Sequence, residues 1–162
     1  MQQRWPVPQA ILIGGTLAGL LDITFAISFA MYNGLTAERL LQVVASGLVG
    51  KAAFSGGFAT AALGLACHFV LSLVWMTVFL LTARQAPSLA ACPLVAAAGY
   101  GVLVFLLMRL VVLPLSAFPN PVTFKPLATT LDLLSHMFLF ALPIVWATRR
   151  ALRPDAGGKG LV

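Results

Sequence analysis

The stretch Phe58–Ala83, FATAALGLACHFVLSLVWMTVFLLTA, decides the fold of this chain. It contains no Asp, Glu, Lys or Arg, and its one histidine, His68, stands near its middle. A helix needs about 20 apolar residues to cross the roughly 30 Å hydrocarbon core of a bilayer, and this stretch is long enough. In lipid, only a helix satisfies its backbone hydrogen bonds within one segment, so the stretch predicts a transmembrane helix.

Three further apolar stretches of similar length lie at about 9–31, 93–115 and 127–148. The whole chain of 162 residues is 60% hydrophobic and only 9% charged. A soluble domain carries about 25% charged residues to face water, so this chain has too few polar side chains for an aqueous surface. The sequence therefore predicts an all-α integral membrane four-helix bundle, a single domain over residues 1–148 that is embedded in a lipid bilayer.

The segments outside the four spans carry weaker signals. Leucines and valines at helical spacing follow Thr36, a suitable N-cap, and predict an additional helix at 36–48 that is either interfacial or re-entrant. The basic, glycine-containing segment 149–162 is expected to be a disordered cytoplasmic tail near anionic lipid. Cys67 and Cys92 are expected to stay reduced, because they lie far apart and form no disulfide framework.

The distribution of Lys and Arg predicts the orientation. If both termini lie on one side, six basic residues lie there: Arg4, Arg84, Arg149, Arg150, Arg153 and Lys159. The other side has three: Arg39, Lys51 and Lys125. This asymmetry favours an orientation with both termini in the cytoplasm. The net charge of +6 does not indicate nucleic acid as a partner, because no Lys/Arg run with interleaved aromatic residues is present.

Titratable residues inside apolar spans are the main lead to function. On a helical wheel, Asp22 shares its face with Gly15 and Gly19, and His68 shares its face with Gly57 and Gly64. Small residues mark helix–helix contacts in membranes, so these four glycines are predicted to pack helices together. Asp22 and His68 are therefore expected to face inward. The candidate site residues are Asp22, His68, Arg109, Asp132 and His136.

Depth along the spans groups these residues into two levels. Counted from the outer end of each span, Asp22, His68 and His136 lie roughly nine or ten residues in, which at about 1.5 Å per residue gives one common level. Arg109 and Asp132 lie roughly five or six residues in and are expected to pair above that level. A lone charge at mid-bilayer costs about 3 kcal/mol on insertion scales, which favours pairing in a buried polar site.

Three functions fit such a site. The first is a non-enzymatic membrane protein that handles protons or a small ion, with Asp22 and His136 titrating, His68 as their partner and the Arg109–Asp132 pair as an outer gate. The second is a haem- or metal-binding redox protein, in which His68, His136 and Asp22 are the candidate metal ligands. The third is a scaffold or assembly factor whose polar residues only lock helix register.

An enzyme is the least favoured class, because no nucleophile–base spacing is present. On the helical wheel, Ser135 points about 100° away from its neighbour His136. No cofactor is assigned by the sequence. Four short spans leave little room for an internal solute path, so transport would need a homo-oligomer.

Several motifs resemble a known family. They are GGTLAGLLDITFA at 14–26, SGLVGKAAFSGG at 46–57, LACHF at 65–69 and YGVLVFLLMRLVVLPLS at 100–116, followed by the last helix that carries His136. Together they resemble uncharacterised bacterial inner-membrane proteins of the YagU-like type, over most of residues 11–148. The resemblance implies an inner-membrane helical bundle and draws attention to Asp22, His68 and the VLPLS run at 112–116. It assigns no reaction.

Overall fold

The computed structural model describes residues 4–153 and, within them, contains helices and no strand. Four helical rods are long and apolar enough to cross a membrane: Val7–Tyr32, Gly57–Gln85, Pro93–Leu115 and Pro126–Ala151. The predicted all-α fold with four membrane-length helices is therefore confirmed, and these helices indicate a membrane protein.

Two of the rods are continuous α-helices, α1 (Val7–Tyr32) and α3 (Gly57–Gln85). The third rod is built from α4 (Pro93–Leu107), η3 (Met108–Val112) and α5 (Leu113–Leu115). The fourth is built from α6 (Pro126–Leu134), η4 (Ser135–Phe140) and α7 (Ala141–Ala151). Both η3 and η4 are π-helical, so the third rod has a wider turn near its end and the fourth rod has one in its middle.

A proline follows each π-helical segment and gives a physical reason for it. Pro114 and Pro143 lack the backbone N–H that an α-helix uses, and a proline ring clashes with the carbonyl four residues earlier. Those carbonyls lie inside η3 and η4, where the hydrogen bonds span five residues instead: Leu113 N–H donates to the Met108 carbonyl, and Ala141 N–H to that of His136. Each wider turn shifts every later side chain around the helix axis.

The predicted segment at 36–48 is a helix, α2 (Ala37–Val49), which runs into the short 3₁₀ turn η1 (Gly50–Ser55). Thr36 is its N-cap and accepts a hydrogen bond of 3.1 Å from the backbone N–H of Arg39. Its buried Gln42 donates to the Gly57 carbonyl at 3.2 Å, which ties α2 to the start of α3. The helix itself is thus confirmed, whereas an interfacial or re-entrant position for it stays a prediction.

The end of the fourth rod corrects one predicted boundary. The tail was expected to begin at residue 149, but α7 continues to Ala151, so Arg149 and Arg150 are helical. Basic side chains in a last turn interact favourably with the negative end of the helix dipole, which supports this longer helix. The rest of the predicted disordered tail, residues 154–162 with Lys159, lies outside the described residues.

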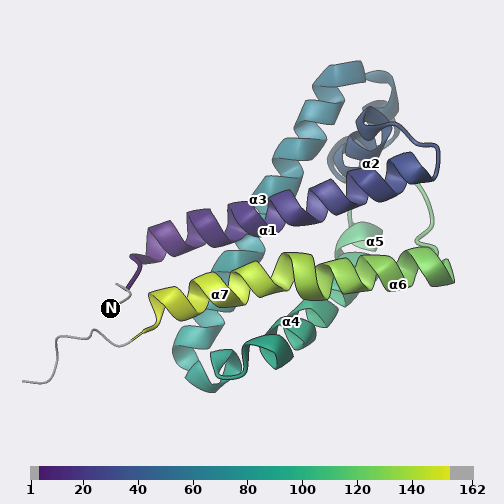
Figure 1. Cartoon of the computed structure of the whole chain (residues 1–162). Helices are drawn as coiled ribbons and strands as arrows, with labels where there is room; N and C mark the ends of the chain where they lie inside the picture. Colours follow the sequence, from purple (N-terminus) through teal and green to yellow (C-terminus); the bar gives the residue numbers. More distant parts are fainter. Residues whose placement is uncertain (1–3, 154–162) are drawn as a thin grey trace, which may run out of the picture.

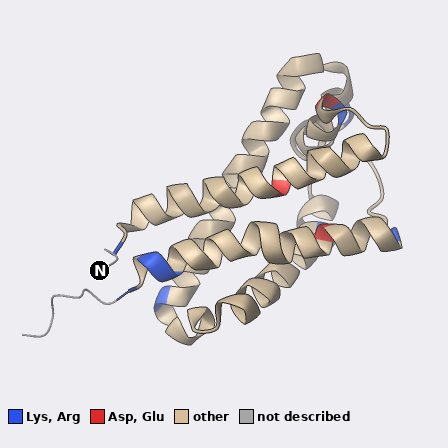
Figure 2. Cartoon of the chain, in the orientation of Figure 1, with Lys and Arg blue, Asp and Glu red and all other residues tan. Residues whose placement is uncertain are grey.

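Figure 1 shows how the rods are arranged. The first rod and the rod α6–η4–α7 lie side by side, α3 crosses against α1 and α2, and α4 packs on α7 and η4. The chain's first described residues meet the end of α7, because Trp5 N–H donates to the Arg150 carbonyl at 3.1 Å. Figure 2 shows Lys and Arg but no Asp or Glu at this end, and further Lys or Arg beside α2 and at the start of α6.

The bundle is packed most tightly in the half that holds this end. Met76 and Leu80 of α3 and Ile144 and Val145 of α7 are fully buried there. Many of their neighbours are alanines, which let the helices approach closely in the way that membrane bundles favour. The other half of the bundle is less densely filled and contains the site described below.

Three of the four glycines predicted to pack helices lie at close contacts. A Cβ added to Gly15 would meet Leu73 at 2.8 Å, and one added to Gly19 would meet Ser72 at 2.7 Å. A Cβ on Gly64 would overlap the backbone carbonyl of Leu41 in α2. The prediction for Gly57 is wrong, because nothing lies within 4 Å of such a Cβ. Gly57 has a positive φ of 55°, so glycine serves backbone conformation there.

Candidate functional site

A cavity of about 710 Å³ lies in the less densely packed half of the bundle. Its walls come from α1, α2, α3, the η3–α5 segment and the fourth rod, and most of the lining side chains are apolar. All five predicted site residues line this cavity: Asp22, His68, Arg109, Asp132 and His136. Each of them is partly buried, so the expectation of a buried site is corrected to a partly exposed cavity wall.

Asp132 joins two of the other groups through its two carboxylate oxygens. Arg109 donates to Oδ2 from Nε at 3.3 Å and from Nη2 at 3.0 Å. Nδ1 of His136 lies 3.3 Å from Oδ1 and donates to the Asp132 carbonyl at 2.9 Å. The exposed side-chain fractions are 20% for Arg109, 37% for Asp132 and 16% for His136. The predicted Arg109–Asp132 pair is therefore confirmed, and His136 extends it.

Arg109 and His136, the two partners of Asp132, make further contacts that hold them in place. Arg109 donates from Nη1 to the Thr123 carbonyl at 2.8 Å, and its guanidinium lies 5.2 Å from the ring centre of Phe105. The imidazole of His136 lies against two aromatic rings, with centroids 5.7 Å from Phe105 and 5.8 Å from Phe140. Phe105 thus contacts both the guanidinium and the imidazole, which restricts how either group can turn.

Asp22 finds a partner that the helical wheel did not predict. Ser135, which is buried, donates from Oγ to Oδ1 of Asp22 at 2.7 Å. Ser135 is the first residue of η4, and the wider π turn begins there. An ideal wheel assumes a constant angle per residue, so it cannot follow the fourth rod through this turn. The prolines at 114 and 143 were the available signal for both π-helical segments.

His68 lies apart from the other groups in its hydrogen bonding. Its Nε2 donates to the backbone carbonyl of Gly19 at 2.9 Å, which joins α3 to α1. The close approach of the two helices at Gly19 places that carbonyl within reach of the imidazole. This contact is the interhelical hydrogen bond that a purely structural histidine would make.

The predicted common layer is only partly assembled. Asp22, His68 and His136 line one cavity, but none of the hydrogen bonds given above joins any two of them. Among residues 4–153, no three His, Cys, Asp or Glu side chains are arranged to hold a metal ion. The grouping of His68, His136 and Asp22 as metal ligands is therefore not found in this part of the chain.

The charges along the cavity wall do not balance. Two carboxylates, Asp22 and Asp132, face one guanidinium, Arg109, which leaves one net negative charge when both histidines are neutral. Asp132 is already paired with Arg109, whereas Asp22 is bonded to an uncharged hydroxyl. The excess negative charge therefore belongs to Asp22.

Two parts of the site had no clear sequence signal. The helix α2 contributes Leu40, Val43, Val44, Gly47 and Leu48 to the cavity lining. Gly101 of α4 permits close contact with η4, because a Cβ there would meet the His136 carbonyl at 2.5 Å and the Met137 Cα at 2.5 Å. Gly101 thus determines how near the backbone of His136 can come to α4.

Comparison with models of protein families, with curated proteins and with solved structures yields no match to this chain.

Proposed function

We propose that this chain is a membrane protein, not an enzyme, that binds protons or a small cation at its cavity wall. The single observation that carries the proposal is that Asp22, Arg109, Asp132 and His136, from three separate rods, line one cavity together with His68. Histidine ordinarily titrates between pH 5 and 8, so a proton is the natural occupant near neutral pH.

The charge of the wall supports a cation rather than an anion. An uncompensated carboxylate is costly in a low-dielectric environment, and a proton or a bound cation removes that cost. Protonation of His136 would place a cation 3.3 Å from the Asp132 carboxylate. Asp22 would then be the second proton acceptor of the wall, held in place by Ser135.

The size of the cavity favours a second candidate within the same class. The cavity has a volume of about 710 Å³ and a mostly apolar lining, as sites for small organic molecules do. A bare ion would be far too small to fill it. An organic ammonium ion would place its charge near Asp22 and its apolar groups against α2. Such a cation would compete with protons for the same wall.

The first test uses the fact that the chain has only two histidines. Histidine-selective ¹⁵N labelling of the protein in lipid nanodiscs gives side-chain signals that a His68→Asn variant assigns. We expect the His136 signal to change with pH and its midpoint to move in Asp22→Asn, because Asp22 lines the same cavity. Glu38→Gln is the matched control, because it removes a carboxylate that does not line the cavity.

The second test measures ion movement or uptake in reconstituted vesicles after a pH jump, with a pH-sensitive dye. Asp22→Asn is expected to abolish the protein-dependent signal, and Glu38→Gln to preserve it. Added tetraethylammonium tests the organic cation and is expected to reduce the signal if that candidate is correct. Equal signals in the wild-type protein and Asp22→Asn would refute proton binding and favour a scaffold whose polar groups only lock helix register.

The proposed location is a bacterial inner membrane with both termini in the cytoplasm. The basic residues gathered where the chain enters α1 and leaves α7 support this orientation (Figure 2). Membership of the YagU-like family is part of the same proposal and rests on the order of the sequence motifs alone. A homo-oligomer is expected if the protein moves a solute, because one chain supplies only four rods.

A further inference from the structure

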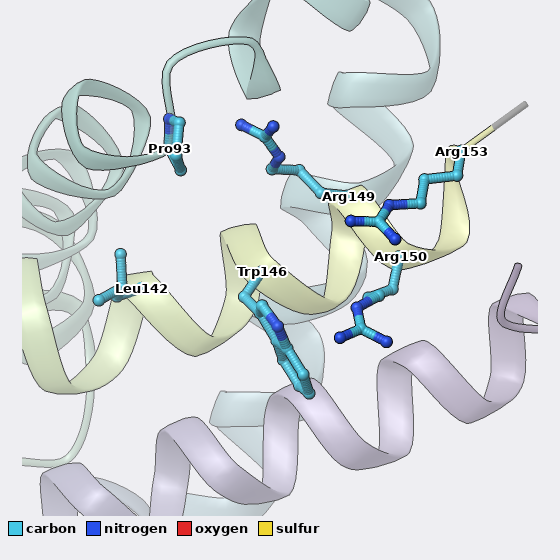
Figure 3. A pocket seen from close by; sticks show the side chains of 6 residues that line it. All are labelled: Pro93, Leu142, Trp146, Arg149, Arg150 and Arg153. Atoms are coloured by element: carbon cyan, nitrogen blue, oxygen red, sulfur yellow. The ribbon is translucent and has the colours of Figure 1, made fainter. Parts of the chain in front are cut away.

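One side of α7 changes in character along its length. Trp146, Arg149 and Arg150 fall on the same side of α7 as Leu142, because they follow it by four, seven and eight residues, and Arg153 lies just beyond the end of the helix at Ala151. The side chains change from apolar to aromatic to basic toward the end of the bundle where Trp5 meets Arg150. Together with the start of α4 they line a cavity of about 310 Å³ (Figure 3), and the lining residues are Pro93, Leu142, Trp146, Arg149, Arg150 and Arg153.

Two of the arginines are held in place by groups that carry no charge. Arg149 reaches toward Pro93 in Figure 3 and donates from Nη1 to the carbonyls of Ala90 and Ala91 at 3.0 and 2.9 Å. The guanidinium of Arg150 lies 5.3 Å from the ring of Trp146 and 5.5 Å from that of Trp5. These partners orient the guanidinium groups without neutralising them.

The ionic partners of Arg149 and Arg150 among the described residues decide whether these two charges are balanced. Within residues 4–153, Arg149 and Arg150 form no ion pair with a carboxylate. The acidic residues of that part, Asp22, Glu38 and Asp132, lie on other elements, and Figure 2 shows none at this end. Two oriented cations beside a cavity therefore form a place where an anion can bind.

We propose that this cavity binds the phosphate group of an anionic phospholipid. Guanidinium groups match phosphate oxygens in geometry as well as in charge. Leu142 and Trp146 continue the site toward the apolar part of the bundle, where an acyl chain would lie. Tryptophan is favoured at the level of lipid head groups, and basic pockets between membrane helices suit acidic lipids. Free phosphate shares the head-group chemistry but makes no use of the apolar half.

The test measures lipid retention by native mass spectrometry on the full-length protein in detergent. Phosphatidylglycerol, phosphatidylcholine and inorganic phosphate are added separately. The site variant is Arg149→Gln with Arg150→Gln, and the matched control, Arg39→Gln with Lys51→Gln, removes two positive charges elsewhere. We expect the site variant to bind phosphatidylglycerol at least about tenfold more weakly than the control variant, since each basic residue near an anionic head group contributes about fivefold.

Arg149 also contacts backbone carbonyls, so circular dichroism must show that the variants fold. If the double variant does not fold, Arg150→Gln alone decides, with Arg39→Gln as its control and an expected loss of about fivefold. Equal losses in site and control variants would overturn the proposal, and so would equal retention of phosphatidylcholine. Displacement of the lipid by millimolar inorganic phosphate would show a free-anion site instead and would also overturn it.

Discussion

Ser135 donates a hydrogen bond of 2.7 Å to the carboxylate of Asp22, and this bond joins the fourth rod to the first across 113 positions of sequence. Ser135 is 3% exposed, so water has little access to the bond. The next residue, His136, lines the same cavity as Asp22. This hydroxyl therefore ties the two rods together and holds the Asp22 carboxylate at the cavity wall.

The first prediction concerns this bond. Ser135→Ala removes the only side-chain donor described for Asp22 and should lower the free energy of unfolding by about 1.5–3 kcal/mol, because the acceptor is charged. Ser28→Ala is the control, since exposed Ser28 donates only to the Thr24 carbonyl in its own helix. Denaturant unfolding in detergent, followed by circular dichroism, measures both. Equal stability of the two variants would contradict the prediction.

The second prediction concerns the Arg109–Asp132 pair. A double-mutant cycle with Arg109→Gln and Asp132→Asn should give a coupling energy of about 1 kcal/mol. This coupling energy is small because the Asp132 side chain is 37% exposed and solvent weakens the attraction between the two charges. A parallel cycle with Lys125→Gln should give nearly zero, because the structure gives Lys125 no ion pair. A similar coupling energy in both cycles would show that the measurement reports the overall charge of the protein and not a specific ion pair, which would contradict the prediction.

The third prediction uses two glycines on the same helix. Gly101→Ala should destabilise the protein by about 1–3 kcal/mol, because the new Cβ would meet the backbone of His136 and Met137. Gly99→Ala should instead stabilise it by roughly 0.5–1 kcal/mol, because nothing lies within 4 Å and alanine favours the helix. Thermal unfolding separates the two signs. A loss of stability in both variants would refute the contact between α4 and η4.

The fourth prediction tests the orientation through cysteine labelling. Cys92 is exposed near the end that holds the termini, and exposed Asn33 follows the opposite end of α1. In intact bacterial cells, a membrane-impermeant maleimide should label Asn33→Cys in a Cys67→Ala, Cys92→Ala background. In a Cys67→Ala variant, where Cys92 is the remaining cysteine, the same maleimide should label Cys92 only after the cells are opened. The reverse pattern would place both termini outside.

Composition was enough to predict the fold class and the membrane-length helices. The prediction of α2 also succeeded, because Thr36 and the spacing of leucines and valines are local signals. The pairing of Arg109 with Asp132 followed from their similar depth along two rods. Gly57 was misassigned because its shared face with His68 suggested packing, whereas its role depends on backbone conformation at the start of α3.

The site was harder to predict than the fold because it depends on the angle at which each side chain leaves its helix. Two π-helical segments change that angle in the rods that carry Arg109 and His136. The wheel therefore pointed Ser135 away from the site, whereas the structure places it against Asp22. The cavity formed with α2 was not predicted either, since it arises from contacts between elements far apart in sequence.

The sequence by itself determined that this protein has four apolar helices of membrane length, because a backbone in lipid must satisfy its hydrogen bonds within each segment. Only the tertiary structure decided which polar groups meet. The Asp132–His136 and Asp132–Arg109 contacts, the Asp22–Ser135 bond and the cavity depend on helix crossings and on turns widened ahead of Pro114 and Pro143. Hydrophobicity is a property of each residue, whereas a meeting of side chains is a property of the packed chain.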